Sequence, residues 1–265
     1  MHALYQNHYL YHNFIFYRMN IALIGYGKMG KEIERCANDR GWSVDIRVDI
    51  DTPPVTKAQR DSIDVAIHFA TAKNIISDLT PWAEAHKPIV VGTTGWQDQW
   101  QGIEALVRKN QIGFLYASNF SIGVNIFFHL IKDAVQMMDT FEEYDAFIQE
   151  IHHKHKIDSP SGTALTMGKI VLEKLKRKKE LLNETSHTAI RPEQLHVSSV
   201  RSGTVVGTHT LAFDSAADTI ELKHIAKNRS GLALGTLFAA EWIQGKKGIF
   251  TMDDAFQDLI KQGTV

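Results

Sequence analysis

Hydrophobic residues recur in short runs along the first half of the chain, and stretches with helical spacing lie between them. The apolar runs occupy residues 21–24, 44–48, 64–69, 88–91 and 112–116. The helical stretches occupy residues 28–40, 71–86 and 96–110. Apolar strands that alternate with helices are typical of a parallel sheet that is covered on both faces. The pattern therefore predicts an α/β fold with a Rossmann-type, doubly wound parallel sheet.

The pattern changes after about residue 121. A long apolar helix at residues 124–138 leads to a strand at residues 144–153, a polar loop and a second helix from Ser161. Alternating strands follow at residues 195–200, 204–213 and 219–225, with Ser-Gly and Asp-Ser turns between them. Such turns favour hairpins. We therefore predict an α+β domain with a mostly antiparallel sheet.

These elements divide the chain into four segments. Residues 19–122 form the predicted nucleotide-type domain, residues 123–230 form the α+β domain, and residues 231–265 carry final helices that return to the first domain. Residues 1–18 hold four of the seven tyrosines and no acid, and they lack the features of a signal peptide. We interpret them as a start codon assigned too early or as a disordered extension. An aromatic arm that packs on a partner subunit is the alternative.

Composition and charge exclude several classes of protein. Lys and Arg total 29 while Asp and Glu total 30, so the formal net charge of −1 creates no overall field that attracts nucleic acid or an acidic membrane. No uncharged apolar run is long enough to span a membrane. The single cysteine, Cys36, can form neither an internal disulfide nor a Cys-rich metal site. We therefore expect a cytoplasmic protein with no nucleic-acid or membrane partner.

A basic run at residues 174–179 follows the helix that begins at Ser161. We interpret it as a solvated last helical turn whose charges complement the helix dipole. The alternative is a patch that binds phosphate or nucleic acid.

A glycine turn follows the first predicted strand directly and opens the first predicted helix. It reads Gly25-Tyr26-Gly27-Lys28-Met29-Gly30, which has the spacing G-x-G-x-x-G. The first glycine permits a tight bend, the second lets the backbone approach a pyrophosphate, and the third lets helix and strand pack closely. The N–H groups at the start of the helix then face the phosphates. The turn therefore predicts a dinucleotide site.

An acid at the end of the second predicted strand supports this prediction. Asp49 lies 24 residues after Gly25, where it can accept hydrogen bonds from a ribose; Asp51 is the alternative. The two carboxylates would repel the 2′-phosphate of NADPH, whereas Lys28 and Arg47 would attract it. We predict that NADH is preferred and that NADPH is still used.

The segment from Glu150 to Thr163 is the richest in titratable groups. Its fourteen residues include three histidines, two lysines and two acids, and its end, Ser161-Gly162-Thr163, opens a helix. Imidazole and ammonium groups side by side can supply a proton and bind an anion. Backbone N–H groups at a helix start can bind a carboxylate. The segment therefore predicts proton transfer to an anionic substrate.

Two other interpretations of this segment stay open. His153 and His155 could form a metal pair, and the whole segment could be a solvated polar loop. Zinc sites usually have three or four ligands from His, Cys and carboxylates. Because Lys154 and Lys156 would repel a cation, we predict no metal.

The same segment resembles the signature of the dihydrodipicolinate reductase family. The pattern reads Glu150-x-His152-His153-x-x-Lys156-x-Asp158-Ser159-Pro160-Ser161-Gly162-Thr163-Ala164. The resemblance covers nearly all of the chain from Met19 onward. Further stretches that resemble the family are residues 25–30, 92–95, 117–125, 201–203, 207–209 and 248–254. The resemblance implies a two-domain enzyme of the diaminopimelate route to lysine. Such an enzyme uses NADH or NADPH to reduce a cyclic dicarboxylate imine.

The resemblance also implies the role of individual residues. His152 matches a proton donor or acceptor, and Lys156 matches the catalytic proton donor. The implied contacts to the substrate carboxylate are His153, Gly162 and Thr163. The expected cofactor-binding residues are those of the glycine turn, the ribose acid and two later stretches: Gly25, Tyr26, Gly27, Lys28, Met29, Asp49, Gly92, Thr93, Thr94, Ser118, Asn119 and Phe120. The turn is one residue shorter than in some relatives and no base follows Asp49, which leaves the cofactor preference open.

The family joins four subunits through sheet-to-sheet contacts of the second domain, which is accordingly expected to bind substrate and to form the oligomer. Long alternating strands in a small domain would otherwise leave edges bare. We therefore expect a homotetramer. The alternatives are another two-domain nicotinamide dehydrogenase and a non-catalytic dinucleotide sensor, which would not need His152 beside Lys156.

Overall fold

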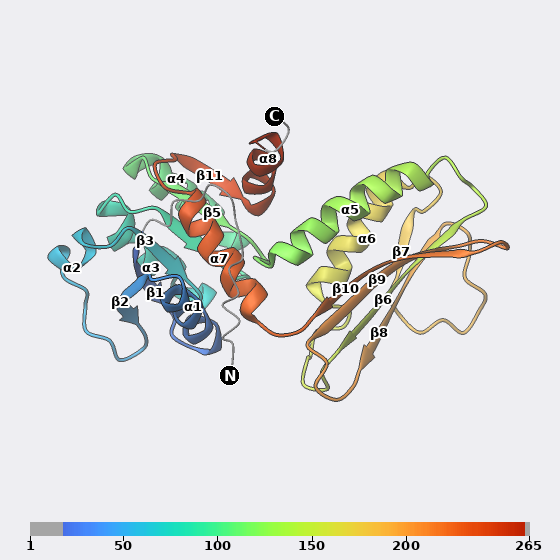
Figure 1. Cartoon of the computed structure of the whole chain (residues 1–265), viewed down its shortest axis with the longest axis horizontal. Helices are drawn as coiled ribbons and strands as arrows, with labels where there is room; N and C mark the ends of the chain where they lie inside the picture. Colours follow the sequence, from blue (N-terminus) through green and yellow to red (C-terminus); the bar gives the residue numbers. More distant parts are fainter. Residues whose placement is uncertain (1–17, 263–265) are drawn as a thin grey trace, which may run out of the picture.

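The computed structural model describes residues 18–262 and has two lobes, each built on one β-sheet (Figure 1). The first lobe holds β1–β5, β11, α1–α4, α7 and α8, and the second lobe holds α5, α6 and β6–β10. The extension expected at residues 1–18 lies outside the described residues except for Arg18, whose Nε donates to the Gly41 carbonyl oxygen at 3.3 Å.

The first sheet is parallel throughout and confirms the predicted Rossmann-type fold. Its six strands lie in the order β11-β5-β4-β3-β1-β2. The strands are β1 (Asn20–Ile24), β2 (Ser43–Val48), β3 (Val65–His68), β4 (Ile89–Val91), β5 (Gly113–Tyr116) and β11 (Gly248–Thr251). The chain reverses direction across the sheet at β1, which lies between β2 and β3. Open α/β sheets bind ligands at such a switch point, beyond the carboxyl ends of the strands.

Helices cover both faces of this sheet because its strands are apolar on both sides. Ile21 and Leu23 of β1 point into one core, while Ala22 and Ile24 point into the other. The first core is closed by α1 (Lys28–Asp39), α7 (Ser230–Trp242) and α8 (Met252–Gln262). The second core is closed by α3 (Ile75–Glu84) and α4 (Trp100–Asn110). A short helix, α2 (Lys57–Asp61), links β2 to β3.

The second sheet is mixed: the predicted antiparallel strands are present, and a parallel half that the sequence pattern did not predict lies beside them. Its order is β10-β9-β6-β8-β7, in which the β10–β9 and β9–β6 pairs are antiparallel and the β6–β8 and β8–β7 pairs are parallel. The strands are β6 (Asp145–His152), β7 (Glu180–Leu182), β8 (Gln194–Arg201), β9 (Gly207–Asp214) and β10 (Thr219–Ala226). The parallel pairs arise because the chain returns twice: α6 (Gly162–Lys174) carries it back between β6 and β7, and residues 183–193 carry it back between β7 and β8.

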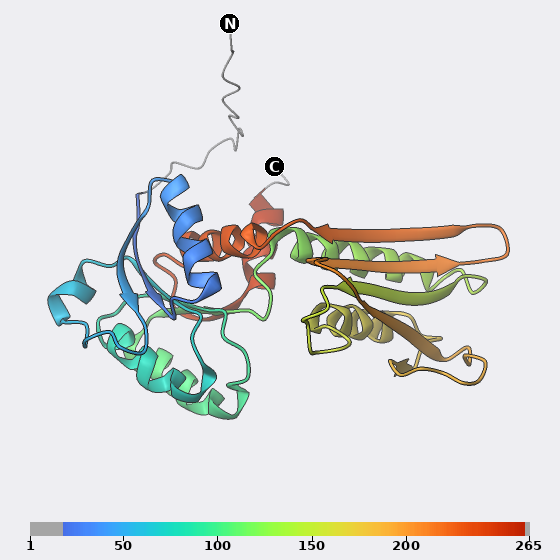
Figure 2. The ribbon, with the colours of Figure 1, turned by 90° about the horizontal axis from the view of Figure 1, so that it is seen from below.

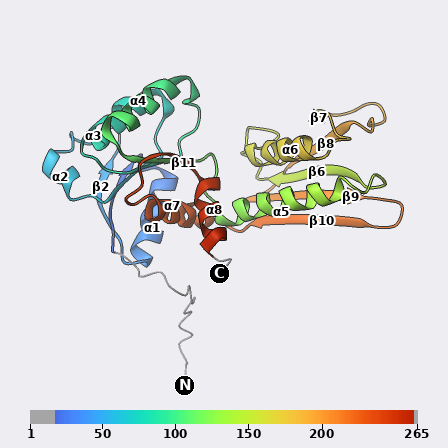
Figure 3. The ribbon, with the colours of Figure 1, turned by 90° about the horizontal axis from the view of Figure 1, so that it is seen from above.

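Only one face of the second sheet is covered by helices. Helices α5 (Ile122–Met138) and α6 pack on it through an apolar core. Seen from below, the strands lie in front of the helices (Figure 2), and from above the helices lie in front (Figure 3). The other face exposes apolar side chains, among them Phe147, Val200 and Ile225, the last with 59% of its surface accessible.

The basic run at residues 174–179 is not a solvated helical turn. Helix α6 ends at Lys174, so the run lies in the turn after it. Lys178 is 1% exposed and donates to the carbonyl oxygens of Pro192 and Gln194. Arg177 donates to backbone carbonyl oxygens beside α5. These two cations hold loops together and are not free for a phosphate or nucleic acid.

Two chain segments connect the lobes, residues 117–121 before α5 and residues 227–229 before α7. The first connection packs against α7, because a Cβ on Gly235 of α7 would come within 1.7 Å of the Phe120 carbonyl oxygen. A Cβ on Gly231 of α7 would lie 3.3 Å from Ser121 Oγ. The first connection and α7, which directly follows the second, therefore form one packed junction between the lobes.

Candidate active site

A cleft of about 1300 Å³ lies between the lobes, and residues from both lobes line it. The first lobe contributes the glycine turn and the loop after β4, and the second contributes the end of β6, the start of α6 and the start of β9. The residues predicted from sequence that line this cleft are Lys28, Thr94, Ser118, Asn119, His152, His153, Lys156, Gly162 and Thr163. The structure thus brings four of the twelve expected cofactor residues and all five expected catalytic and substrate residues to one space.

The glycine turn has the shape that a dinucleotide pyrophosphate needs. Gly25 has a φ of +90°, and a Cβ there would come within 2.5 Å of the Phe69 carbonyl oxygen. A Cβ on Gly30 would come within 2.6 Å of the Gly25 carbonyl oxygen, so α1 approaches β1 only with glycine there. A Cβ on Gly27 would meet nothing within 4 Å, and no side chain caps the start of α1. A phosphate can therefore reach the first N–H groups of this helix.

Strand register places a charged cluster at the end of β6. Glu150 of β6 pairs with Ser199 of β8 and with His209 of β9, and His152 pairs with Arg201. The Glu150 side chain is fully buried. Its Oε1 accepts hydrogen bonds from Ser199 Oγ at 2.8 Å and Arg201 Nη2 at 2.7 Å, and from the Ser161 backbone N–H at 3.0 Å. Burial opposes ionisation of this carboxyl, but the three donors outweigh it and its pKa falls to about 2.

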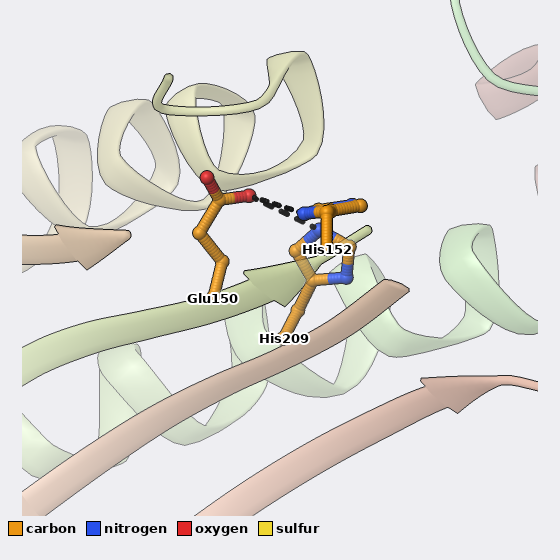
Figure 4. Close-up of side chains that lie close together, drawn as sticks. All are labelled: Glu150, His152 and His209. Carbon is orange, nitrogen blue, oxygen red and sulfur yellow. Dashed lines mark ion pairs between the residues drawn. The ribbon is translucent and has the colours of Figure 1, made fainter. Parts of the chain in front are cut away.

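Two histidine rings lie against the second oxygen of this carboxylate (Figure 4). The distance from Glu150 Oε2 is 3.1 Å to His152 Nδ1 and 3.8 Å to His209 Nε2. The two rings pack edge to face, 5.0 Å apart. Burial, together with the neighbouring His152, lowers the pKa of His209 to about 4. Burial also lowers the pKa of His152, against the carboxylate, which raises it. His209 is therefore neutral at physiological pH.

Lys156 lies on the loop that follows β6 and lines the cleft. Its Nζ donates to both carboxylate oxygens of Asp158, at 2.9 and 2.8 Å. This hydrogen bond lowers the pKa of Asp158. Arg201 Nη2 donates to the Asp158 carbonyl oxygen at 2.6 Å, so the loop is tied to the cluster around Glu150. The loop therefore holds an ammonium group in place beside His152.

The start of α6 faces the cleft and is well formed. Its N-cap residue, Ser161, accepts a hydrogen bond from the Ala164 N–H and lies 3.2 Å from His209 Nε2. A Cβ on Gly162 would meet nothing within 4 Å. Asn119 Nδ2 donates to Thr163 Oγ1 at 3.3 Å, which links the junction between the lobes to the helix start. The backbone here can bind a carboxylate of a ligand in the cleft.

The remaining predicted residues lie behind the cleft or beside it. Thr93 is buried, and its hydroxyl donates to the Ala70 carbonyl oxygen at 3.1 Å and lies 2.7 Å from His68 Nδ1. Phe120 is 1% exposed and packs on Phe69. The predicted residues that the structure does not place among the lining residues are Gly25, Tyr26, Gly27, Met29, Asp49, Gly92, Thr93 and Phe120. The side chains of Thr93 and Phe120 thus support the backbone behind the cleft.

Arg47, beside the expected ribose site, is held by a carboxylate. Its guanidinium Nε lies 3.1 Å from Glu34 Oε2, and Nη2 contacts Glu34 Oε1. Tyr26 of the glycine turn donates its hydroxyl proton to the same carboxylate, and the guanidinium lies over the Tyr26 ring. Asp49 is exposed, and its Oδ1 accepts the Ile50 N–H at 2.9 Å. Arg47 is therefore neutralised where a 2′-phosphate would lie.

No individual site role is predicted from sequence for Glu150, Arg201 and His209, although all three lie in stretches that resemble the family, and Ser161 is predicted only as part of the helix start that can bind a carboxylate. The structure groups the four, and the strand register that joins the first three requires knowing which strands pair. Glu150, His152 and His209 place three potential metal-ligand atoms within 4.8 Å of one another. The Arg201 guanidinium already supplies a positive charge to this carboxylate, so we assign the cluster to proton chemistry.

Within residues 18–262, no helix has the length and apolar character needed to cross a membrane. This agrees with the apolar runs of the sequence, all of which lie in the strands and helices of the two lobes.

Comparisons with known proteins show what this chain resembles. The family profile described as dihydrodipicolinate reductase, N-terminus, matches residues 19–120, and the one described as dihydrodipicolinate reductase, C-terminus, matches residues 123–256. The 4-hydroxy-tetrahydrodipicolinate reductase of Christiangramia forsetii is 41% identical over 244 residues, which are 92% of this chain and 100% of that protein. The protein of that name from Neisseria gonorrhoeae is 34% identical over 221 residues, 82% of this chain and 81% of that protein.

A solved structure shares the fold. The dipicolinate-bound dihydrodipicolinate reductase from Paenisporosarcina sp. TG-14 aligns with a TM-score of 0.71 at 22% identity. The alignment covers 90% of this chain and 99% of that chain. Both lobes are therefore common to the two proteins.

Proposed function

The chain belongs to the dihydrodipicolinate reductase family, and from this premise we propose how its own residues reduce 4-hydroxy-tetrahydrodipicolinate in the diaminopimelate route of lysine biosynthesis. The reaction adds one hydride and one proton to the substrate and releases one water. A bound reduced nicotinamide supplies the hydride. The observation that carries the proposal is the cleft that Lys28 of the glycine turn and the segment from Glu150 to Thr163 both line. A cytoplasmic location stays a prediction.

The first lobe fits the dinucleotide. The uncapped start of α1 and the open space at Gly27 suit the pyrophosphate. Asp49 is the proposed acceptor for the ribose hydroxyls, and Asp51 remains the alternative. Thr94, Ser118 and the amide of Asn119 line the part of the cleft that leads to the second lobe. We assign the nicotinamide to that part.

The second lobe supplies cations and N–H groups for a dicarboxylate. Gly162 and Thr163 offer backbone donors at the start of α6, and His153 lines the cleft beside them. A carboxylate at a helix start is stabilised by both hydrogen bonds and the helix dipole. Lys156 and His152 lie at the end of β6, where one of them can give a proton to the reacting ring.

The proposed preference for NADH rests on the charges around the ribose. Arg47 is neutralised by Glu34, and the exposed carboxylates of Asp49 and Asp51 remain to repel a 2′-phosphate. Repulsion between charges at about 4 Å is on the order of 1 kcal/mol in bulk water and larger where solvent is excluded. Lys28 lines the cleft and opposes this preference. We expect NADPH to be used as well, with a lower kcat/KM.

A homotetramer is the proposed assembly. The bare face of the second sheet carries Phe147, Val200 and Ile225, which are exposed in the single chain. Glu221 and Lys223 of β10 lie on the same face as Ile225 and can pair across a contact. Apolar side chains flanked by charged ones are typical of an interface between subunits.

The function is tested by oxidation of the reduced cofactor with freshly made 4-hydroxy-tetrahydrodipicolinate. We expect substrate-dependent loss of the reduced nicotinamide absorbance. His152→Ala and Lys156→Ala should each lower kcat by about 10²-fold or more, the usual effect of removing a general acid. Cofactor affinity should stay near that of the parent, because neither residue lies in the glycine turn. Full turnover in both variants would contradict the assignment of the proton donors.

A further inference from the structure

Glu150 carries a negative charge in a fully buried position at the end of β6. Its Oε1 receives all three hydrogen bonds that hold the side chain, from Ser161, Ser199 and Arg201. These donors come from two segments, Ser161 at the start of α6 and Ser199 and Arg201 on β8, so they hold Oε1 in place. Oε2 points toward His152.

Glu150 Oε2 lies closer to His152 Nδ1, at 3.1 Å, than to His209 Nε2, at 3.8 Å. Glu150 Oε2 and His152 Nδ1 are both buried, and within the described part of the chain neither makes a hydrogen bond of good geometry, to the other or to any further group. Buried polar atoms are almost always paired in proteins. The distance between the two atoms is that of a hydrogen bond, and a small turn of the ring would let a proton on Nδ1 satisfy both.

We infer that Glu150 is a positioning residue, which keeps a proton on His152 Nδ1 and so presents Nε2 to the substrate. The inference rests on the proposed function, in which His152 exchanges the proton. Nε2 faces Gly207, a residue that lines the cleft; a Cβ there would lie 3.0 Å from it. The protonated ring gives its Nε2 proton to the substrate, becomes neutral with Nδ1–H still facing Glu150, and regains a proton from water.

The charges around His152 determine what the loss of Glu150 would do. The groups that face this ring are Glu150 on the same strand, His209 on β9, Arg201 on β8, and Lys156 and Asp158 on the following loop. Burial, Lys156 and Arg201 lower the pKa of His152, while Glu150 and Asp158 raise it. Without the Glu150 carboxylate, His152 therefore loses its proton at a lower pH.

The central experiment measures the pH dependence of kcat in Glu150→Gln, which keeps the shape of the side chain and removes its charge. We expect kcat at neutral pH to fall about tenfold or more, as part of the effect of a general acid. The basic limb of the profile should move to lower pH. Glu143→Gln makes the same chemical change at an exposed position in the turn before β6, so its profile should keep the basic limb of the parent.

A double variant separates failure of this inference from failure of the proposed function. If Glu150 acts through His152, adding Glu150→Gln to His152→Ala should lower kcat no further, because the two residues act as a unit. If kcat of the double variant fell by the product of the two single-variant losses, the inference would be overturned, while the role of His152 would stand. Full turnover in His152→Ala alone would instead contradict the proposed function.

A measurement on the parent protein covers the case in which Glu150→Gln does not fold. Nitrogen-15 shifts of the His152 ring, assigned by their loss in His152→Ala, report which nitrogen carries the proton. We expect the neutral ring to carry it on Nδ1. A proton on Nε2 of the neutral ring would overturn the inference.

Discussion

Glu34 is the side chain on which we expect the choice of cofactor to depend. It neutralises Arg47 and accepts the hydroxyl proton of Tyr26. Glu34→Gln should free the positive charge of Arg47 and raise the NADPH-to-NADH ratio of kcat/KM by about tenfold, which corresponds to about 1.4 kcal/mol. Steady-state kinetics at fixed salt with both cofactors measure this ratio.

A neighbouring carboxylate supplies the matched control. Glu32 lies on the same helix and pairs with Arg35. Glu32→Gln removes the same charge but leaves Arg47 held, so its ratio should stay near that of the parent. If the ratio rose equally in both variants, the change would reflect overall charge and the role of Glu34 would be wrong.

The buried histidines should make stability fall in mild acid. Folded His209 stays neutral down to about pH 4, against 6.5 for an unperturbed histidine. Between the folded and unfolded pKa values of His209, the unfolded state therefore binds more protons than the folded state. Because of this difference, the protein has its full stability above the unfolded pKa and loses stability as the pH falls toward the folded pKa. This group alone contributes a slope of up to about 1.4 kcal/mol per pH unit.

Urea unfolding across this window checks the prediction. His209→Gln should show a shallower fall of the unfolding free energy than the parent. The slope should not vanish, because burial also lowers the pKa of His68, His152 and His224. Equal slopes in parent and variant would show that His209 takes up its proton without unfolding.

Individual residues mark the limit of what the sequence can predict. The roles of His152 and Lys156 are predicted from the resemblance of one continuous segment to the family, whereas no role is predicted for His209, which lies on another strand and joins that segment only through the β6–β9 register. Lys178 looks solvated within its basic run, yet backbone carbonyl groups from a distant loop bury it. Spacing along the chain does not contain this information.

Helices and strands were predicted where burial leaves a periodic pattern. The strands of the first sheet are buried on both sides, so their apolar runs stand out. In the parallel half of the second sheet, β8 was predicted at residues 195–200, but β7 was not, because it has only three residues and none of them is fully buried. The strand that pairs with β6 depends on the path of the chain after β6. The alternation of polar and apolar residues along a strand is the same whether it pairs in parallel or antiparallel, so the sequence pattern does not give the direction.

Helix α7 fits against the junction only because residue 235 is glycine. In Gly235→Ala the Cβ would lie 1.7 Å from the Phe120 carbonyl oxygen, a clash with backbone. Alanine favours a helix over glycine by about 1 kcal/mol, but overpacking costs about 1–3 kcal/mol. We therefore expect a net loss of stability, measured as a lower Tm.

Gly231→Ala on the same helix is the control. Its Cβ would meet Ser121 Oγ at 3.3 Å, a contact that a small side-chain shift relieves. The Tm of this variant should fall less than that of Gly235→Ala. An unchanged Tm in Gly235→Ala would mean that the junction is looser than the structure indicates.

The assembly can be tested on the whole molecule. Light scattering at micromolar concentration should give a mass near four times 29.9 kDa. Ile225→Glu places a charge on the bare sheet face and should reduce the mass, because an unpaired charge in an apolar contact is costly. A parent mass near that of one chain would contradict the tetramer.

Met137 provides the comparison for that variant. It is 67% exposed on α5, on the helical side of the second lobe. Met137→Glu should leave the mass unchanged if the sheet face makes the contact. If only Met137→Glu reduced the mass, the contact would involve the helices instead.

The return of the chain to its first lobe has a consequence during translation. One wall of that lobe comes from α7 and α8, with Leu237, Ile243 and Phe256 in its core, and its edge strand is β11. While the ribosome is still making β6 to β10, the β1–β5 sheet is therefore already synthesised, yet one of its faces is covered by α1 alone. The second lobe, which is continuous in sequence, can complete its fold first. We expect nascent chains that stop before α7 to depend on chaperones, although every residue of the glycine turn has already emerged.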